Sequence, residues 1–230
     1  ASALLADNPV MAEYYQATYG RACAQIAYGA ACGPPADSGA PARFGLERKR
    51  YLLVVARLEP ENNTDLIVEE YRRSGVALPL AVVGDAPYGA AYLEELKRLG
   101  GEHVRFLGRV DDQAALNGLF AGAYLHLHGH EVGGTNPSLL RAMAAGTAPL
   151  ALDALFNQAV LGGTGFLFKK EPGDLAGRLG RLCASPETVE SAGRAARERA
   201  EREYTWEAVT AAHAALFAGL AGPKEPRGDP

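Results

Sequence analysis

A glycine turn that leads into a helix is the part of this sequence whose residue types best fit chemistry. Gly133, Gly134, Thr135 and Asn136 precede Pro137, and proline favours the first turn of a helix because its missing N–H would have no partner there. Glycines let a ligand approach the backbone, and the free N–H groups and dipole of a helix start attract anions. The turn therefore predicts an anion or nucleotide site. The alternative is a structural turn capped by Asn136.

A candidate cation for the same chemistry follows the apolar run YLLVVA at 51–56. Arg57 stands at its end, and a guanidinium can donate two hydrogen bonds to a phosphate at once. The alternative is a surface arginine that pairs with Glu59 or Glu61.

Three histidines precede the glycine turn. His126, His128 and His130 alternate along a predicted strand end, so their side chains point to one face. Three such side chains could bind a metal, but we expect none here: one histidine lines a cleft and the others pack or form hydrogen bonds.

The elements that must position these residues alternate regularly. Each apolar run is short and is followed by a helical pattern, which predicts a parallel sheet with helices on both faces. Strands are predicted at 51–56, 78–84, 104–108, 123–128, 148–153 and 165–169, and helices at 64–74, 88–100, 112–121, 137–145, 155–161, 173–184, 186–202 and 205–220. Ligands of such sheets bind beyond the carboxyl ends of the strands, where Arg57, Gly84, Asp85, Gly108, residues 128–136 and Asp153 stand.

The ends of the chain follow other patterns. Residues 1–20 read as a helix, with Asp7 or Asn8 as its cap before Pro9, and residues 21–27 as a short strand. A segment rich in Gly, Pro and Ala follows and reads as a linker, and the final residues, from Gly222, read as disordered.

Composition limits the class of protein. The 230 residues suit either one large α/β domain or a domain plus appended pieces. The net charge of −4 argues against a nucleic-acid binder that relies on bulk positive charge. Cys23, Cys32 and Cys183 are too few and too scattered for a disulfide framework. Because we find neither a signal peptide nor an apolar run of the ~20 residues that span a bilayer, we expect a cytoplasmic protein with possible contact to the inner membrane face.

Several segments together resemble a known family. VVARLEPENN (54–63), VVGDAP (82–87), VRFLGRV (104–110), HGHEVGGTNPSLLRAMAAGTAPLALD (128–153) and FNQAVLGGTGFLF (156–168) occur in this order. They resemble the C-terminal, donor-binding domain of a GT-B glycosyltransferase of the family 4 type, closest to the bacterial rhamnosyltransferase-like branch. No Gly-x-Gly-x-x-Gly follows the first strand and no P-loop occurs, which disfavours classical dinucleotide enzymes and P-loop NTPases.

The resemblance implies a domain organisation. Residues 1–29 would be a remnant of the acceptor-binding N-terminal domain, 30–50 a linker, 51–221 the nucleotide-sugar-binding domain and 222–230 a disordered tail. The fold would be a Rossmann-like, doubly wound parallel sheet of about six strands, one half of a GT-B fold, with extra C-terminal helices.

The resemblance also implies roles for individual residues. Arg57 would neutralise the donor diphosphate and is the one catalytic candidate. Asn62 stands where the family has a second cation, a lysine. The turn 133–136 would contact the diphosphate or the sugar. Phe106, Leu107 and Gly108 would flank the base. Arg141 takes the place of a glutamate that accepts the ribose hydroxyls, and arginine has no acceptor, so it would contact phosphate or weaken nucleotide binding. His130 and Glu131 are further cleft candidates.

The implied function is the binding of a nucleotide-sugar donor, with dTDP-rhamnose suggested by the branch, in a retaining enzyme that needs no metal. The acceptor would be a saccharide or a lipid-linked saccharide bound by the missing domain, so the fragment alone would be inactive. The alternative is a degenerate nucleotide-binding module that kept the fold and lost the reaction, favoured by Arg141 and Asn62. A GT-B-fold epimerase is disfavoured because no distinct acidic pair is apparent.

Overall fold

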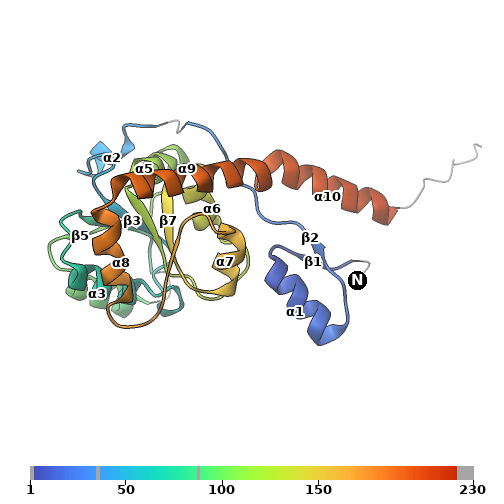
Figure 1. The fold of residues 1–230 in the computed structure, drawn as a ribbon, viewed down its shortest axis with the longest axis horizontal. Helices are drawn as coiled ribbons and strands as arrows, with labels where there is room; N and C mark the ends of the chain where they lie inside the picture. The colour runs from blue at the N-terminus through green and yellow to red at the C-terminus, as the bar shows by residue number, and fades with distance from the viewer. Residues whose placement is uncertain (1–2, 35–36, 87–88, 222–230) are drawn as a thin grey trace, which may run out of the picture.

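The computed structural model describes residues 3–34, 37–86 and 89–221, and its centre is a parallel sheet of six strands (Figure 1). The strands lie in the order β5-β4-β3-β6-β7-β8. Their bounds are β3 Leu52–Val55, β4 Leu80–Val83, β5 Val104–Gly108, β6 Leu125–His128, β7 Ala148–Leu152 and β8 Phe166–Phe168. All five pairings are parallel, which confirms the predicted doubly wound sheet.

Helices cover both faces because the central strands are apolar on both sides. One face packs against α3 Thr64–Ser74, α4 Ala90–Gly100 and α8 Asp174–Cys183, and the other against α5 Gln113–Gly122, α6 Pro137–Ala144 and α9 Pro186–Glu203. α7 Leu155–Leu161 adds Val160 and Leu161 to the second core. A 3-10 turn, Pro60–Asn62, joins β3 to α3.

One buried carboxylate joins two helices of the first face. Glu70 of α3 is only 2% exposed, and its side chain accepts hydrogen bonds from the N–H groups of Gly173 (2.9 Å) and Ala176 (3.2 Å) at the start of α8. A negative charge at that helix start stabilises it. Glu70 thereby joins the start of α8 to α3.

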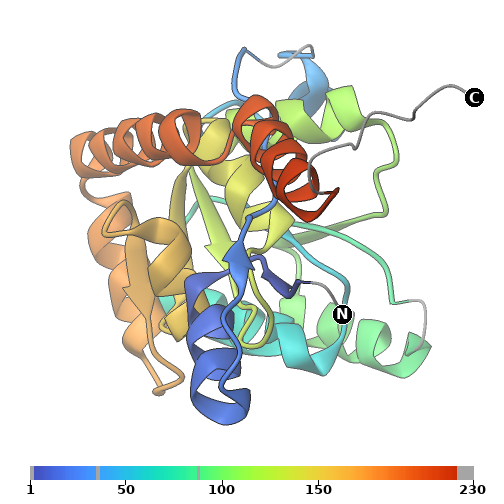
Figure 2. The same cartoon turned by 90° about the vertical axis from the view of Figure 1, so that its right-hand side faces the viewer.

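The N-terminal residues form a small unit of their own. β1 Leu5–Ala6 and β2 Ala24–Gln25 pair in parallel around α1 Pro9–Tyr19, and α1 lies beside α7 (Figure 2). The predicted helix over 1–20 is wrong at its start: Leu5 and Ala6 are strand, and Asn8 caps the helix by accepting from the N–H of Val10 at 3.0 Å. Residues 1–2 lie outside the described residues.

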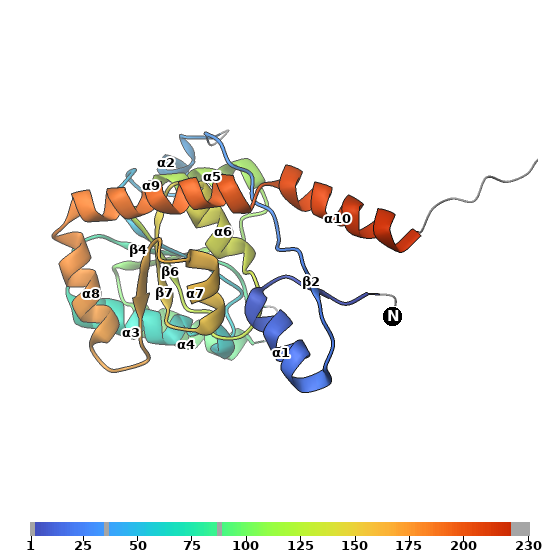
Figure 3. The ribbon, with the colours of Figure 1, turned by 45° about the vertical axis from the view of Figure 1, so that its right-hand side comes forward.

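The segment predicted as a linker crosses to the sheet domain along α5. It contains a short helix, α2 Ala40–Arg43, that packs on α5. Ala30 bridges to Thr205 at the junction between α9 and the last helix, α10 Trp206–Ala221. α10 continues away from the sheet (Figure 3), and the predicted tail 222–230 lies outside the described residues.

Candidate functional site

The strand order creates a crevice at the carboxyl edge of the sheet. From β3 the chain moves outward through β4 to β5 and then returns to β6 on the other side of β3, and ligands of such sheets bind where the order reverses. A cavity of about 620 Å³ lies there, which we call the switch-point cavity. The ends of four strands and the start of α6 contribute to its lining, with Arg57 after β3, Gly84 and Asp85 after β4, Arg109 after β5, His130 after β6, and Asn136 and Ser138 at α6.

Two contacts of the loops beside β3 shape the walls of this crevice. A side chain at Gly84 would collide with the carbonyl of Ala56, and its φ of +148° suits glycine. Asn63, in a left-handed conformation with φ of +52°, donates from its amide to the carbonyl of Gly129 at 2.8 Å. That bond ties the loop after β3 to the loop after β6, so the two walls of the cavity hold together.

Arg57 and Asn62, both predicted to contact phosphate, line the switch-point cavity. They differ in exposure and in hydrogen-bond partners. The Arg57 guanidinium is largely exposed and lies 3.5 Å from a carboxylate oxygen of Glu61. Asn62 is buried, and its amide donates to the carbonyl of Arg57 at 2.8 Å. Arg57 can therefore exchange Glu61 for a ligand, whereas Asn62 positions the backbone of Arg57.

The glycine turn divides into two parts. Asn136 caps α6, accepting from the N–H of Ser138 at 2.9 Å, and lines the switch-point cavity. Gly133 is exposed, with φ of +134°. Gly134 and Thr135 instead face the N-terminal unit: a carboxylate oxygen of Asp7 accepts from the N–H of Thr135 at 3.1 Å, and the Thr135 hydroxyl donates to the Asp7 carbonyl.

Asp7 thus occupies one N–H group of the turn that the sequence predicts to meet an anion. A carboxylate is itself an anion, so this contact agrees with the electrostatics of a helix start. The sequence suggested Asp7 only as a cap of α1, a position that Asn8 takes instead. The contact joins residues 128 apart, and no local pattern indicates it.

The three histidines lie on one face of β6 and the loop that follows, as predicted. His126 and His128 are buried, His128 and His130 stack with ring centroids 4.4 Å apart, and Ser138 Oγ lies 3.4 Å from His128 Nδ1. Burial lowers the pKa of His126 to about 3 and that of His130 to about 4, and lowers the pKa of His128 well below its usual range. All three rings are therefore neutral near pH 7, and only His130 lines the switch-point cavity.

The cleft candidate Glu131 turns away from the cavity. Its carboxylate pairs with Lys170 after β8. The loop that carries His130 and Glu131 is fixed by Asn157, whose amide donates to the carbonyls of His130 and Leu152, both at 2.9 Å. Asn157 is a positioning residue of this loop.

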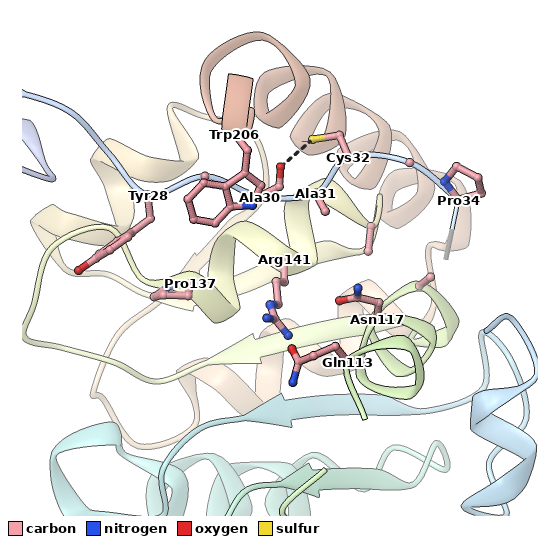
Figure 4. A pocket seen from close by; sticks show the side chains of 14 residues that line it. Tyr28, Ala30, Ala31, Cys32, Pro34, Gln113, Asn117, Pro137, Arg141 and Trp206 are labelled. Carbon is pink, nitrogen blue, oxygen red and sulfur yellow. Dashed lines mark hydrogen bonds between the residues drawn. The ribbon is translucent and has the colours of Figure 1, made fainter. Parts of the chain in front are cut away.

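Arg141 faces a second cavity, of about 420 Å³, between α5, α6 and residues 28–34 (Figure 4). We call it the Arg141 cavity. Burial lowers the pKa of the half-buried Arg141 guanidinium. Arg141 is absent from the lining of the switch-point cavity, as are Phe106, Leu107 and Gly108, whose neighbours Arg109 and Val110 line it instead. The residues predicted for nucleotide binding are therefore divided between β5 and the Arg141 cavity.

The structure also bears on a metal site and on a membrane-spanning helix. Among the described residues, no group of three or more His, Cys, Asp or Glu side chains is arranged to hold a metal ion. In the same part of the chain, no helix combines the length and the apolar character needed to cross a membrane.

The family follows from a comparison of the sequence with known families. Residues 41–199 match the model of the group 1 glycosyl transferases. The chain belongs to the group 1 glycosyltransferases. No curated protein matches the sequence.

Solved structures show that the chain has the fold of one half of a GT-B protein. The chain is similar to sucrose-phosphate synthase from Thermosynechococcus elongatus (21% identity, TM-score 0.79, 94% of this chain and 58% of that one). It is also similar to HepE from Anabaena in complex with UDP (20% identity, TM-score 0.82, 96% of this chain and 64% of that one). A glycosyltransferase from Rickettsia africae is similar as well (11% identity, TM-score 0.83, 96% of this chain and 64% of that one). This group 1 domain therefore spans about three fifths of the length of these neighbours.

Proposed function

We propose that this group 1 domain binds the nucleotide-sugar donor of a retaining glycosyltransferase that moves a hexose to a saccharide acceptor. The observation that carries the proposal is the switch-point cavity, which places Arg57 and Arg109 at the carboxyl edge of the sheet in a domain of this family. The similar HepE structures hold UDP, or UDP-glucose, which supports a nucleotide sugar here. The sequence motifs favour dTDP-rhamnose as the donor and a polysaccharide or lipid-linked acceptor, met at the inner face of the membrane.

The chemistry follows from the charges around the cavity. A glycosyl transfer leaves a nucleoside diphosphate, and cations preorganised around the departing oxygens stabilise it. Arg57 and the start of α6 supply positive charge there, so the proposed reaction proceeds without a metal. We expect the acceptor and its general base to come from the rest of the protein, so that this chain alone binds donor and transfers no sugar.

A calorimetric titration with UDP, dTDP and GDP tests the donor role. We expect one of them to bind, and Arg57→Gln to weaken it about 10- to 100-fold, since a hydrogen bond to a charged group contributes ~1.5–3 kcal/mol. Arg98→Gln, which removes another exposed arginine, paired with Glu95 on α4, should leave the affinity unchanged. Equal affinity of the Arg57 variant and the parent chain would refute the assignment.

A second candidate is a degenerate module that keeps the fold and has lost the reaction. Arg141 favours it because arginine cannot accept hydrogen bonds from ribose hydroxyls, and so does Asn62, whose amide is engaged by the Arg57 carbonyl. Arg141→Glu then should raise the affinity for nucleotide. Micromolar binding by the parent chain, with no gain in the variant, would reject this candidate.

A further inference from the structure

The Arg141 cavity is a second concave site, separate from the switch-point cavity apart from the shared Pro137. Its volume of about 420 Å³ lies in the range of small-molecule sites, ~300–1,000 Å³. Four parts of the chain form its walls: α5, α6, residues 28–34, and Trp206 at the start of α10 (Figure 4).

The charge in this cavity is unbalanced. Other cations at the carboxyl edge have carboxylate partners: Arg57 pairs with Glu61, Arg109 with Asp111 and Lys170 with Glu131. Arg141 forms no ion pair within the described part of the chain, and none of the fourteen lining residues is acidic. A half-buried guanidinium without a counter-ion favours an anionic ligand, to which it can donate two hydrogen bonds.

Neutral polar groups stand beside Arg141. Gln113 and Asn117 lie one turn apart on α5, so both face α6, and in Figure 4 the Arg141 side chain extends toward Gln113. The Gln113 amide donates to the carbonyl of Asp111 at 3.0 Å, which leaves its oxygen as an acceptor. Carboxamides can both donate and accept, which suits hydroxyl groups next to an anion.

An indole lies at the opposite wall. Trp206 is 52% exposed, and its ring is pressed against Gly29, where a Cβ would lie 2.6 Å from the indole. The ring is thus held in place while part of it stays open, together with the exposed ring of Tyr28. A fixed aromatic surface can pack against the C–H groups of a ligand ring.

We propose that the Arg141 cavity binds a sugar that carries one anionic group, either the carboxylate of a uronic acid or a phosphate ester. The anion pairs with Arg141, the hydroxyls meet Gln113 and Asn117, and the ring lies toward Trp206. This site does not depend on the donor role of the switch-point cavity.

Acidic side chains fix the orientation of the ligand. Burial raises the pKa of the Cys32 thiol at the far end of the cavity, and the nearby carboxylates of Glu201 and Glu207 raise it further, against a smaller lowering by Arg197. The carboxylates near Cys32 disfavour an anion at that end, and Arg141 is the one cation among the lining residues, so the charge of the ligand belongs at Arg141.

The fluorescence of Trp206 offers a direct test because it is the one tryptophan of the chain. The chain is titrated with glucuronate, glucose 6-phosphate, glucose and inorganic phosphate. We expect at least one acidic sugar to change the emission and to bind at least 10-fold more tightly than glucose or inorganic phosphate. Whether glucuronate or glucose 6-phosphate binds better identifies the anion.

Variants separate this site from the donor site. Arg141→Met keeps the apolar stem and should lower the affinity for the acidic sugar at least 10-fold, whereas Arg57→Gln should leave that affinity unchanged. Arg141→Lys keeps the positive charge and should lower the affinity less than Arg141→Met does. The proposal is overturned if no acidic sugar outcompetes glucose, if inorganic phosphate binds as tightly, or if Arg141→Met binds unchanged. It is also overturned if UDP displaces the sugar competitively, which would assign the cavity to the nucleotide.

Discussion

At the scale of the residue, the contact between Asp7 and Thr135 bears most directly on ligand binding. A phosphate bound at the turn 133–136 would meet the N–H group of Thr135, which the Asp7 carboxylate holds at 3.1 Å. The two anions compete for one donor and repel each other. Asp7 therefore lowers the affinity of the turn for an anion unless the ligand itself displaces the N-terminal unit.

Replacing Asp7 tests this competition. We expect Asp7→Asn, which removes the charge and keeps an acceptor, to bind UDP or dTDP about 10-fold more tightly than the parent chain, in keeping with the ~1.5–3 kcal/mol of a charged hydrogen bond. Glu13→Gln removes a charge from an exposed position of α1 and should change nothing. Calorimetry gives both values, and weaker binding by the Asp7 variant would mean that Asp7 supports the turn rather than competes with its ligand.

At the scale of the element, the packing of residues 37–41, which include the start of α2, on α5 depends on two glycines. A Cβ at Gly118 would collide with the carbonyl of Asp37 and lie 2.8 Å from Ala40, and one at Gly122 would lie 2.6 Å from Pro41. The glycines thus allow backbone to approach backbone. They secure α2 against α5.

Alanine substitutions distinguish the effect of this close packing on stability from the effect of helix propensity. Alanine is favoured over glycine in a helix by ~1 kcal/mol, so Gly180→Ala in α8, where a Cβ meets open space, should stabilise the chain by up to that amount. Gly118→Ala should instead destabilise it by ~1–3 kcal/mol through overpacking. Urea unfolding measures both, and a stabilised Gly118 variant would contradict the close contact.

The same elements show what the sequence could and could not predict. The apolar runs placed β3 to β8 within about two residues of their observed bounds, because buried parallel strands are apolar throughout. The local sequence pattern places Leu5 in a helix instead of a strand. Its strand pairing is with Ala24, which is distant in the sequence, so no local pattern indicates it. Arg57 and Asn136 were predicted at the cavity from their places at strand and helix ends, whereas the contact of Asp7 and the direction of Arg141 depend on tertiary packing that spacing does not encode.

At the scale of the whole molecule, the histidines of β6 link stability to pH. The strand runs through the middle of the sheet, and within the described residues His126 Nε2, His128 Nε2 and His130 Nδ1 have no hydrogen-bond partner. A proton on any of them would be a buried charge without compensation. Burial accordingly lowers the pKa of His126 to about 3 and that of His130 to about 4.

The direction of the pH effect follows from linkage. A histidine in the unfolded chain has a pKa of ~6.5. Below that pH these histidines bind protons in the unfolded chain but stay neutral in the folded chain. The free energy of unfolding should therefore fall as pH decreases from about 6.5 toward 4, by ~1.4 kcal/mol per pH unit for each histidine and ~4 kcal/mol per unit for the three together. Since domains are stable by only ~5–15 kcal/mol, the chain should unfold near pH 4–5.

Urea titrations at pH 7.5, 6.5, 5.5 and 5.0 measure this slope. His126→Phe removes one titrating group from a site already packed against the ring of Phe120, and it should reduce the slope by about a third. His103→Asn removes an exposed histidine and should leave the slope as it is. A stability that stays level between pH 6.5 and 5.0 would mean that protons reach these rings in the folded state, and β6 would then have to admit water beside the loop that carries His130.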